Sequence, residues 1–314
     1  MNIGMLQFAL AKGIGDATIK KAISFLKENK CSWEELCNSY DLLSISIGLK
    51  DEVIENIDLS RPKAEELSNK LSKNNVEILI ESEIDYPKFL KTMLREKCPP
   101  ILFVKGNISL LNSAAVGFCG SRKVSAKGIS ITRECAYQLS KKGITVISGY
   151  AAGTDLAAHR AALESGGNTI FVLSEGILKA YEKKEIKSLL NDSNHVFVSQ
   201  FMPELSWNAG NAMKRNSTII GLSQSMILVE SGKSGGTFAA GEESLKANCP
   251  LFVIDFAKPE VSAEANPYFI SKGGIPIRGK QGIPNLSEVF KCVEQNTRQS
   301  QNNNYEYTQL KLEF

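Results

Sequence analysis

The chain has 314 residues, of which 43% are hydrophobic and 23% are charged, and its formal net charge is +3. This composition is that of an ordinary globular protein, long enough for one large unit and a smaller companion. The charge is too small to indicate a nucleic-acid binder by itself, so such a function has to rest on local clusters of cations.

The cysteine and histidine content argues against a disulfide framework and a metal centre. The seven cysteines are scattered and never occur as CxxC, and His159 and His195 are the two histidines. The first residues carry no basic leader before an apolar core, and no stretch approaches about 18 uninterrupted apolar residues. We therefore expect a cytoplasmic protein without a metal, a disulfide frame or a membrane span.

Residues 1–60 predict a small all-helical module. Apolar residues recur at helical spacing in TIKKAISFLKEN, and Gly13 and Gly15 flank Ile14 in the turn before it. A glycine turn that opens a helix exposes backbone N–H groups, which can hold one DNA phosphate without reading sequence. The same glycines are also explained if they only allow two helices to cross closely.

Residues 61–113 read as a linking helix, a strand and a proline-punctuated approach to a further strand, which we expect to pack on the main domain. From residue 114 to residue 292, near-continuous apolar strands alternate with helices. This alternation predicts an α/β domain, a Rossmann-like parallel sheet with helices on both faces and ligands at the carboxyl ends of its strands. Residues 293–314 are polar up to a final QLKLEF, so a disordered tail is expected there.

The strand-end turns of this domain repeatedly carry glycines and cations. In the first turn, Gly120 allows close backbone approach to an anion and Arg122 offers a two-pronged hydrogen-bonding fork. Thr154 or Asp155 is expected to cap the next helix. Several cationic loops at one sheet edge would suit a polyanion such as single-stranded DNA. The candidate residues in these turns are Gly120, Ser121, Arg122, Lys123, Lys127, Gly149, Gly153, Lys214, Arg215, Asn216, Lys233, Ser234, Gly235, Gly236 and Thr237.

Cofactor motifs are absent from the sequence. The GSR turn is not GxGxxG, and ITVISG ends without the acidic residue that would hold a ribose. A GxxxxGK[ST] loop does not occur either. We expect neither a dinucleotide cofactor nor an ATP-driven activity.

The motifs occur in an order that resembles the DprA/Smf family of DNA-processing proteins up to about residue 292. They are KGIG, DYPKFL, PPILFVKGN, GSRKVSAKG, SGYAAGTDLAAHRAAL, KRNSTIIGLS, VESGKSGGTFAA and the pair Gly273 and Gly274. The resemblance implies a Rossmann-like domain that binds single-stranded DNA, a homodimer, and a recombination mediator that loads the RecA recombinase without catalysing a reaction.

The chain departs from the family pattern at three places. Ala152 and Ser217 stand where the family usually has arginines, and IDFAKPE replaces the usual PG before the late glycines. Each lost phosphate contact lowers DNA affinity and flattens its salt dependence. A divergent member with altered DNA binding is therefore expected.

An enzyme of the nucleotide-binding or nucleotide-cleaving class is the alternative. Glu242 and Glu243 follow the glycine-rich turn SGGT, and a carboxylate beside a ribose can stabilise an oxocarbenium-like transition state. This would be an N-glycosidase-like activity. A solvated helix face explains the same two glutamates.

The terminal QLKLEF resembles the peptide by which bacterial proteins bind the sliding clamp of DNA polymerase. Gln309, Leu310, Leu312 and Phe314 fall on the positions of that motif. An apolar anchor at the free end of a solvated tether is suited to a groove on a partner. A final edge strand or a dimer contact is the alternative, because LKLEF also alternates like a strand.

Overall fold

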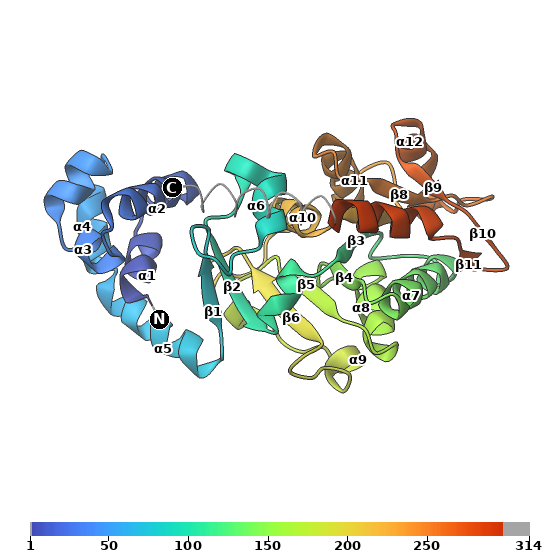
Figure 1. Ribbon diagram of the computed structural model, residues 1–314, viewed down its shortest axis with the longest axis horizontal. Helices are drawn as coiled ribbons and strands as arrows, with labels where there is room; N and C mark the ends of the chain where they lie inside the picture. Colours follow the sequence, from blue (N-terminus) through green and yellow to red (C-terminus); the bar gives the residue numbers. More distant parts are fainter. Residues whose placement is uncertain (1, 298–314) are drawn as a thin grey trace, which may run out of the picture.

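The structure is a computed structural model that describes residues 2–297 (Figure 1). The chain begins with a helical module, as expected from the sequence, and Figure 1 shows this module at one end of the molecule. Its elements are α1 (Ile3–Leu10), α2 (Asp16–Asn29), α3 (Trp33–Cys37), the π-helical turn η1 (Leu42–Ser46) and α4 (Asp51–Leu59), and α5 (Arg61–Lys73) leads away from it. In α2, the apolar residues Ile19, Ala22, Ile23 and Leu26 are buried on one face.

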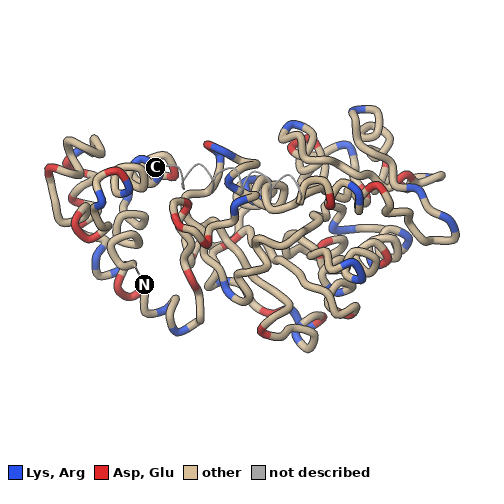
Figure 2. Tube along the Cα trace, viewed as in Figure 1, with Lys and Arg blue, Asp and Glu red and all other residues tan. Residues whose placement is uncertain are grey.

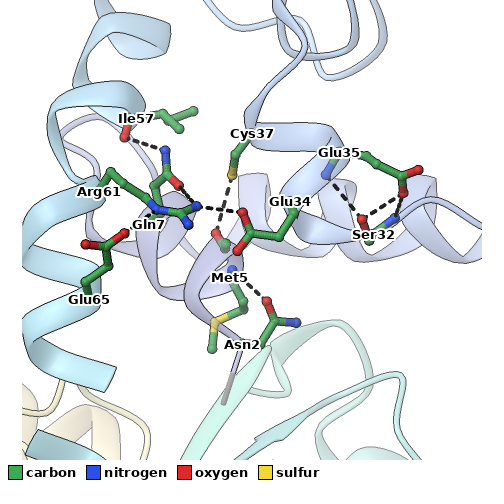
Figure 3. Close-up of polar contacts among 11 residues, drawn as sticks. Asn2, Met5, Gln7, Ser32, Glu34, Glu35, Cys37, Ile57, Arg61 and Glu65 are labelled. Atoms are coloured by element: carbon green, nitrogen blue, oxygen red, sulfur yellow. Dashed lines mark hydrogen bonds and ion pairs between the residues drawn. The ribbon is translucent and has the colours of Figure 1, made fainter. Parts of the chain in front are cut away.

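Polar contacts around Arg61 hold the module together (Figure 3). The guanidinium of Arg61 donates from Nη1 to Glu34 Oε2 at 2.6 Å and to Gln7 Oε1 at 3.2 Å, and from Nε to Glu65 Oε1 at 2.8 Å. Gln7 in turn donates to the backbone oxygen of Ile57 at 3.1 Å. One forked cation therefore connects α1, α3 and α5.

The main sheet in the described part of the chain has nine strands in the order β1-β2-β6-β5-β4-β3-β7-β8-β9. From β6 to β9 neighbouring strands are parallel, as expected, but β1 and β2 are antiparallel additions at one edge. The strands are β1 (Glu77–Ile80), β2 (Ile101–Gly106), β3 (Ala115–Cys119), β4 (Thr145–Ser148), β5 (Thr169–Val172), β6 (His195–Ser199), β7 (Ser225–Leu228), β8 (Leu251–Ile254) and β9 (Ile275–Ile277).

Helices cover both faces of this sheet. One face packs against α7 and α8, and the other packs against α6, α10, α11 and α12. This three-layer arrangement follows from strands that are apolar on both sides. The helices are α6 (Lys88–Leu94), α7 (Ala126–Lys141), α8 (Thr154–Glu164), α9 (Lys184–Lys187), α10 (Ala209–Leu222), α11 (Gly236–Lys246) and α12 (Asn266–Ser271).

The core of the helical module continues into the sheet. Phe8 and Trp33 of the module belong to the same buried cluster as Phe171 of β5 and Phe197 of β6. The rings of Phe171 and Phe197 stack with their centroids 4.6 Å apart. The module and this end of the sheet therefore share one apolar core.

The C-terminal part of the described chain crosses back over the sheet. After the hairpin β10 (Gly279–Lys280) and β11 (Ile283–Pro284), a helix covers residues 287–297 and buries Val289 and Val293. These two residues are four positions apart, so both face the core. Ordered structure thus continues past the boundary at 293 that composition indicated, and QLKLEF lies outside the described residues.

Within residues 2–297, no helix is both long enough and apolar enough to cross a membrane. The same residues contain no group of three or more His, Cys, Asp or Glu side chains placed to hold a metal ion. Lysine and arginine are interspersed with acidic residues along the trace (Figure 2). The place where an anion would bind therefore depends on how individual lysines and arginines are positioned in the fold.

Candidate functional site

The strand order creates a crevice at the carboxyl ends of β3 and β7. These strands are neighbours, but the chain runs from β3 towards β4, β5 and β6 on one side and from β7 towards β8 on the other. Connections that leave two adjacent parallel strands in opposite directions open a crevice between them, where ligands of such sheets bind.

A cavity of about 540 Å³ occupies this crevice. Its size is in the range of small-ligand sites. It is lined by Phe118, Cys119, Gly120, Ser121, Arg122, Ala151, Asp155, Trp207, Ala209, Ala212, Met213, Arg215, Asn216, Ile219, Ile220, Met226, Gly232, Ser234, Gly236, Thr237, Ala240 and Ser262. Eight of the sequence-predicted residues are thereby brought together: Gly120, Ser121, Arg122, Arg215, Asn216, Ser234, Gly236 and Thr237.

The turn after β3 is held closely against its neighbours. A Cβ atom on Gly120 would lie 2.3 Å from Thr154 Oγ1, so this position tolerates only glycine. The Ser121 amide donates to the backbone oxygen of Glu230 at 3.0 Å. The buried Glu230 carboxylate accepts from the Ser125 amide at 2.9 Å and from the Ser125 hydroxyl. Glu230 therefore fixes the turns after β3 and β7 to each other.

Arg215 lies on the inner wall of the cavity, whereas the sequence analysis placed it among cationic loops at the edge of the sheet. Its side chain comes from α10, the residue is only 7% exposed, and Nε and Nη1 are buried without a hydrogen-bond partner among the described residues. Burial lowers the pKa of Arg215, and the nearby Asp155 acts in the opposite direction. An arginine side chain nevertheless stays protonated, and an unpaired buried ion costs several kcal/mol.

Gly149 allows Arg215 to occupy this place. A Cβ atom on Gly149 would lie 1.8 Å from Nη1 of Arg215. The backbone oxygen of Gly149 is 2.6 Å from Nε2 of the fully buried His159, whose Nδ1 is 2.6 Å from Thr169 Oγ1. Burial lowers the pKa of His159 to about 3, so this ring is neutral at physiological pH. Gly149 thus leaves space for the side chain of Arg215, and its backbone oxygen contacts the ring of His159.

Asp155 is a buried wall residue and does not cap α8. The residue before that helix, Gly153, provides no side-chain cap. Asp155 accepts from the Ser148 hydroxyl at 2.8 Å and from the Ala151 amide at 3.2 Å. Burial raises the pKa of Asp155, while Arg215 and these two hydrogen bonds oppose the rise.

The mouth of the cavity carries a residue that the sequence analysis missed. Trp207, in the loop before α10, is 49% exposed, and the guanidinium carbon of Arg122 lies 5.8 Å from its ring centroid. An exposed tryptophan beside a cation is a platform for an aromatic ligand. Trp207 lies in a polar loop without a periodic pattern, so the sequence does not mark it as a functional residue. Its exposure in the folded structure does.

The remaining predicted cations lie around the cavity and not in its lining. Lys123 is exposed beside Arg122, and Lys127 lies 5.3 Å from the ring centroid of Phe256. Lys233 pairs with Glu264 at 3.2 Å, and Lys214 pairs with Asp16 at 2.7 Å.

The five other predicted glycines take part in packing or in turns. Gly149 packs on Arg215, Gly153 and Gly235 precede α8 and α11 with positive φ, and Gly13 and Gly15 form the turn before α2. The turn before α2 lies on the helical module, and Asp16, which pairs with Lys214, follows it directly.

The positions that depart from the family pattern lie outside the cavity lining. Ala152 is exposed, and Ser217 donates its hydroxyl to the backbone oxygen of Lys214 at 2.7 Å. The alternative catalytic glutamates also lie elsewhere. Glu242 accepts from the Tyr268 hydroxyl at 2.8 Å, and Glu243 is half-buried near Lys97 and Lys246, with its pKa raised chiefly by burial. Neither carboxylate is among the residues that line the cavity.

Comparison with known proteins identifies relatives of the chain. It is 28% identical to the DNA processing protein DprA of Bacillus subtilis over 177 residues, 55% of this chain and 58% of that protein. It is 31% identical to DprA of Streptococcus pneumoniae over 187 residues, 59% of this chain and 66% of that protein. The chain thus spans less than two thirds of the length of either relative.

Solved structures share the fold. The crystal structure of S. pneumoniae DprA matches with a TM-score of 0.73 at 22% identity, over 90% of this chain and 96% of that one. A structure of DNA processing protein A from Helicobacter pylori, described by its single-stranded DNA binding mode, matches with a TM-score of 0.57 at 22% identity, over 74% and 98%. The family model described as DNA recombination-mediator protein A matches residues 77–283, more than half of the chain. The chain therefore belongs to this family of DprA/Smf DNA-processing proteins.

Proposed function

We propose that the protein binds single-stranded DNA without sequence preference, through the loops around the cavity, and acts in the cytoplasm as a recombination mediator. The observation that carries the proposal is that one cavity at the switch point of the sheet is lined both by Arg122 and by the buried Arg215, whose Nε and Nη1 have no partner among residues 2–297. The DNA-processing names of the relatives and the strand-binding protein of H. pylori support it.

The physical argument concerns the kind of anion that suits this site. A single free phosphate would need one cationic subsite, whereas the exposed Lys123 and Lys127 extend the positive charge beyond the cavity mouth. A strand that carries several phosphates makes use of such a spread, and an exposed aromatic ring stacks on any base. These features favour a single strand over a duplex, whose bases are stacked on one another.

The direct test is a fluorescence anisotropy titration of a labelled single-stranded oligonucleotide at several salt concentrations. We expect saturable binding whose logarithm falls linearly with the logarithm of salt concentration, with a slope of about −0.7 for each phosphate contacted. Oligonucleotides of unrelated sequence should bind equally well, and the matching duplex more weakly. Absence of strand binding at low salt would contradict the proposal.

The mediator role adds two partners, by analogy with the family: RecA and a second copy of this chain. We propose that the protein binds a strand as a homodimer and promotes RecA assembly on it, with no chemical change in the DNA. The test is RecA filament formation on a strand already coated with a single-strand-binding protein, with light scattering to determine the mass of the mediator. A RecA lag time that the protein does not shorten would refute the role.

The terminal peptide supports a separate proposal, that Gln309, Leu310, Leu312 and Phe314 direct the protein to the sliding clamp. The support is the motif in the sequence, because these residues lie outside the described range. Deletion of residues 309–314 should abolish co-elution with the clamp and leave the melting temperature unchanged. Leu310→Ala with Phe314→Ala should have the same effect, and unchanged co-elution of both variants would refute the idea.

A further inference from the structure

The outer face of α7 carries a line of exposed residues that leads away from the cavity mouth. Arg122 lines the cavity, and α7 begins shortly after it, at Ala126. The helix has 16 residues and is about 24 Å long, and it lies beside α8 on one face of the sheet (Figure 1). Five exposed residues at the spacing i, i+4, i+7, i+11 and i+15 form this outer line: Ala126, Ser130, Arg133, Tyr137 and Lys141.

Cations without acidic partners stand near both ends of the outer line. Lys123 and Lys127 at the cavity end and Lys141 at the far end are exposed, and none of the three pairs with a carboxylate of residues 2–297. The single acidic residue of α7, Glu134, is half-buried and accepts a hydrogen bond from Gln138 at 3.0 Å. The excess of positive charge on this exposed surface attracts phosphate groups.

The arginine in the middle of the outer line is already paired. Arg133 donates from Nη2 to Glu164 Oε2 of α8 at 2.8 Å, and Oε1 of the same carboxylate accepts from Arg160 at 2.7 Å. One carboxylate thus holds two guanidinium groups in place. We therefore expect Lys141, and neither of these arginines, to supply a phosphate contact.

An exposed aromatic ring lies next to the cation at the far end. Tyr137 is 46% exposed, and Lys141 Nζ lies 5.4 Å from its ring centroid. The uncharged residues Ala126 and Ser130 of the outer line are small, so the line offers no broad apolar surface of the kind that a protein partner covers. A ring on which a base stacks, with a cation beside it for the phosphate, is how proteins hold a single strand without reading its sequence.

We propose that the outer line of α7 is a second contact region for a DNA strand, with a base against Tyr137 and a phosphate at Lys141. The strand leaves the cavity mouth past Lys123 and Lys127 and runs along α7. The proposal rests on the strand-binding function and gives the strand a path beyond the cavity. A long strand therefore gains contacts that a short one bound at the cavity does not reach.

The test compares labelled single strands of about 4 and about 16 nucleotides, the limits of the site sizes of OB folds that bind single strands. Fluorescence anisotropy with the full-length protein at several salt concentrations measures affinity and salt slope. Lys141→Gln should reduce the magnitude of the log–log salt slope by about 0.7 for the long strand and leave that of the short strand unchanged. Lys73→Gln is the matched control, because Lys73 is also an exposed lysine in the last turn of a helix, α5, and it should change neither slope.

Replacement of Tyr137 tests the stacking contact separately from charge. Tyr137→Leu removes the aromatic ring and should lower affinity for the long strand about 5- to 100-fold. Tyr137→Phe keeps the ring and should retain the affinity of the wild type. The short strand should bind equally well to the wild type and to both variants.

The two strands separate the failure of this proposal from the failure of the strand-binding function. The proposal is overturned if Lys141→Gln and Tyr137→Leu bind the long strand as the wild type does, or if they weaken the short strand as much as the long one. Binding of both strands by the wild type would then leave the strand-binding function intact, whereas binding of neither would contradict that function as well. Unchanged strand binding with an altered mass of the variants in light scattering would identify a second copy of this chain as the occupant of the outer line, and would overturn the DNA contact.

Discussion

Lys214 and Asp16 form an ion pair of 2.7 Å that connects α10, at the edge of the cavity, to the first turn of α2 in the helical module. Both side chains are about half exposed, at 55% and 51%. If the protein binds DNA as proposed, Asp16 on the module would compete with DNA phosphates for Lys214, which the sequence analysis placed among the DNA contacts.

Removal of that carboxylate should strengthen DNA binding. Asp16→Asn frees Lys214, and because exposed ion pairs contribute roughly 0.2–1 kcal/mol, strand affinity should rise by about 1.4- to 5-fold with little change in stability. Anisotropy at low salt measures the effect. Asp41→Asn, an exposed change elsewhere on the module, is the control and should leave the affinity unchanged. A decrease for Asp16→Asn would show that the pair orients the module for DNA.

Arg122 should contribute one phosphate contact to strand binding. Arg122→Ala is expected to lower affinity and to reduce the magnitude of the log–log salt slope by about 0.7, because one fewer counterion is released. Arg160→Ala removes an arginine of comparable exposure that is paired with Glu164, and its slope should match that of the wild type. If Arg122→Ala and Arg160→Ala had the same salt slope, the strand would not contact Arg122.

The close approach of Gly149 to Arg215 predicts a steric effect on stability. A Cβ atom on Gly149 would lie 1.8 Å from Nη1, so Gly149→Ala should cost about 1–3 kcal/mol in the free energy of unfolding, measured with urea. Adding Arg215→Met should recover part of this loss, since the clashing atoms are gone. Gly236→Ala, where a Cβ atom meets nothing within 4 Å, should be neutral or slightly stabilising.

Burial of His159 predicts a pH dependence of stability. Its pKa is about 3 in the folded protein and near 6.5 in the unfolded chain, so between these values the unfolded state binds the extra proton. This contribution to stability is present above pH 6.5 and is lost at up to about 1.4 kcal/mol per pH unit as the pH falls towards 3.

The raised pKa of Asp155 acts with the opposite sign, so the informative quantity is the difference between the wild type and His159→Gln. Urea unfolding at pH 7, 6 and 5 should show that this variant loses less stability on acidification than the wild type does. Parallel pH profiles would mean that the ring is protonated or solvated in the folded state.

The alternation of strands and helices from residue 114 onwards could be predicted because each buried strand is a short apolar run and each helix has an apolar stripe. The direction of β2 could not be predicted from the sequence. Its sequence, ILFVKG, is as apolar as a parallel strand, and its antiparallel pairing with β6 depends on long-range contacts such as Phe103 opposite Ser199. Local pattern carries no information about which neighbour a strand will find.

The place of Arg215 was accessible from the sequence but was not recognised. Arg215, Ile219 and Leu222 are spaced i, i+4 and i+7, which puts the guanidinium on the apolar face of α10. A cation at such a position is either paired internally or aimed at a ligand. Trp207 had no comparable indication, because its loop has no periodic pattern and the cavity mouth exists only after α10 and the turn after β3 have come together.

The apolar core that the helical module shares with β5 and β6 bears on how the molecule loses its structure. Phe8 and Trp33 belong to the same buried cluster as Phe171 and Phe197, so melting the module would expose apolar surface of this shared cluster to water. The two parts should therefore unfold cooperatively, in one transition and not in sequence. The helical module and the sheet are then one thermodynamic unit, despite being two architectural ones.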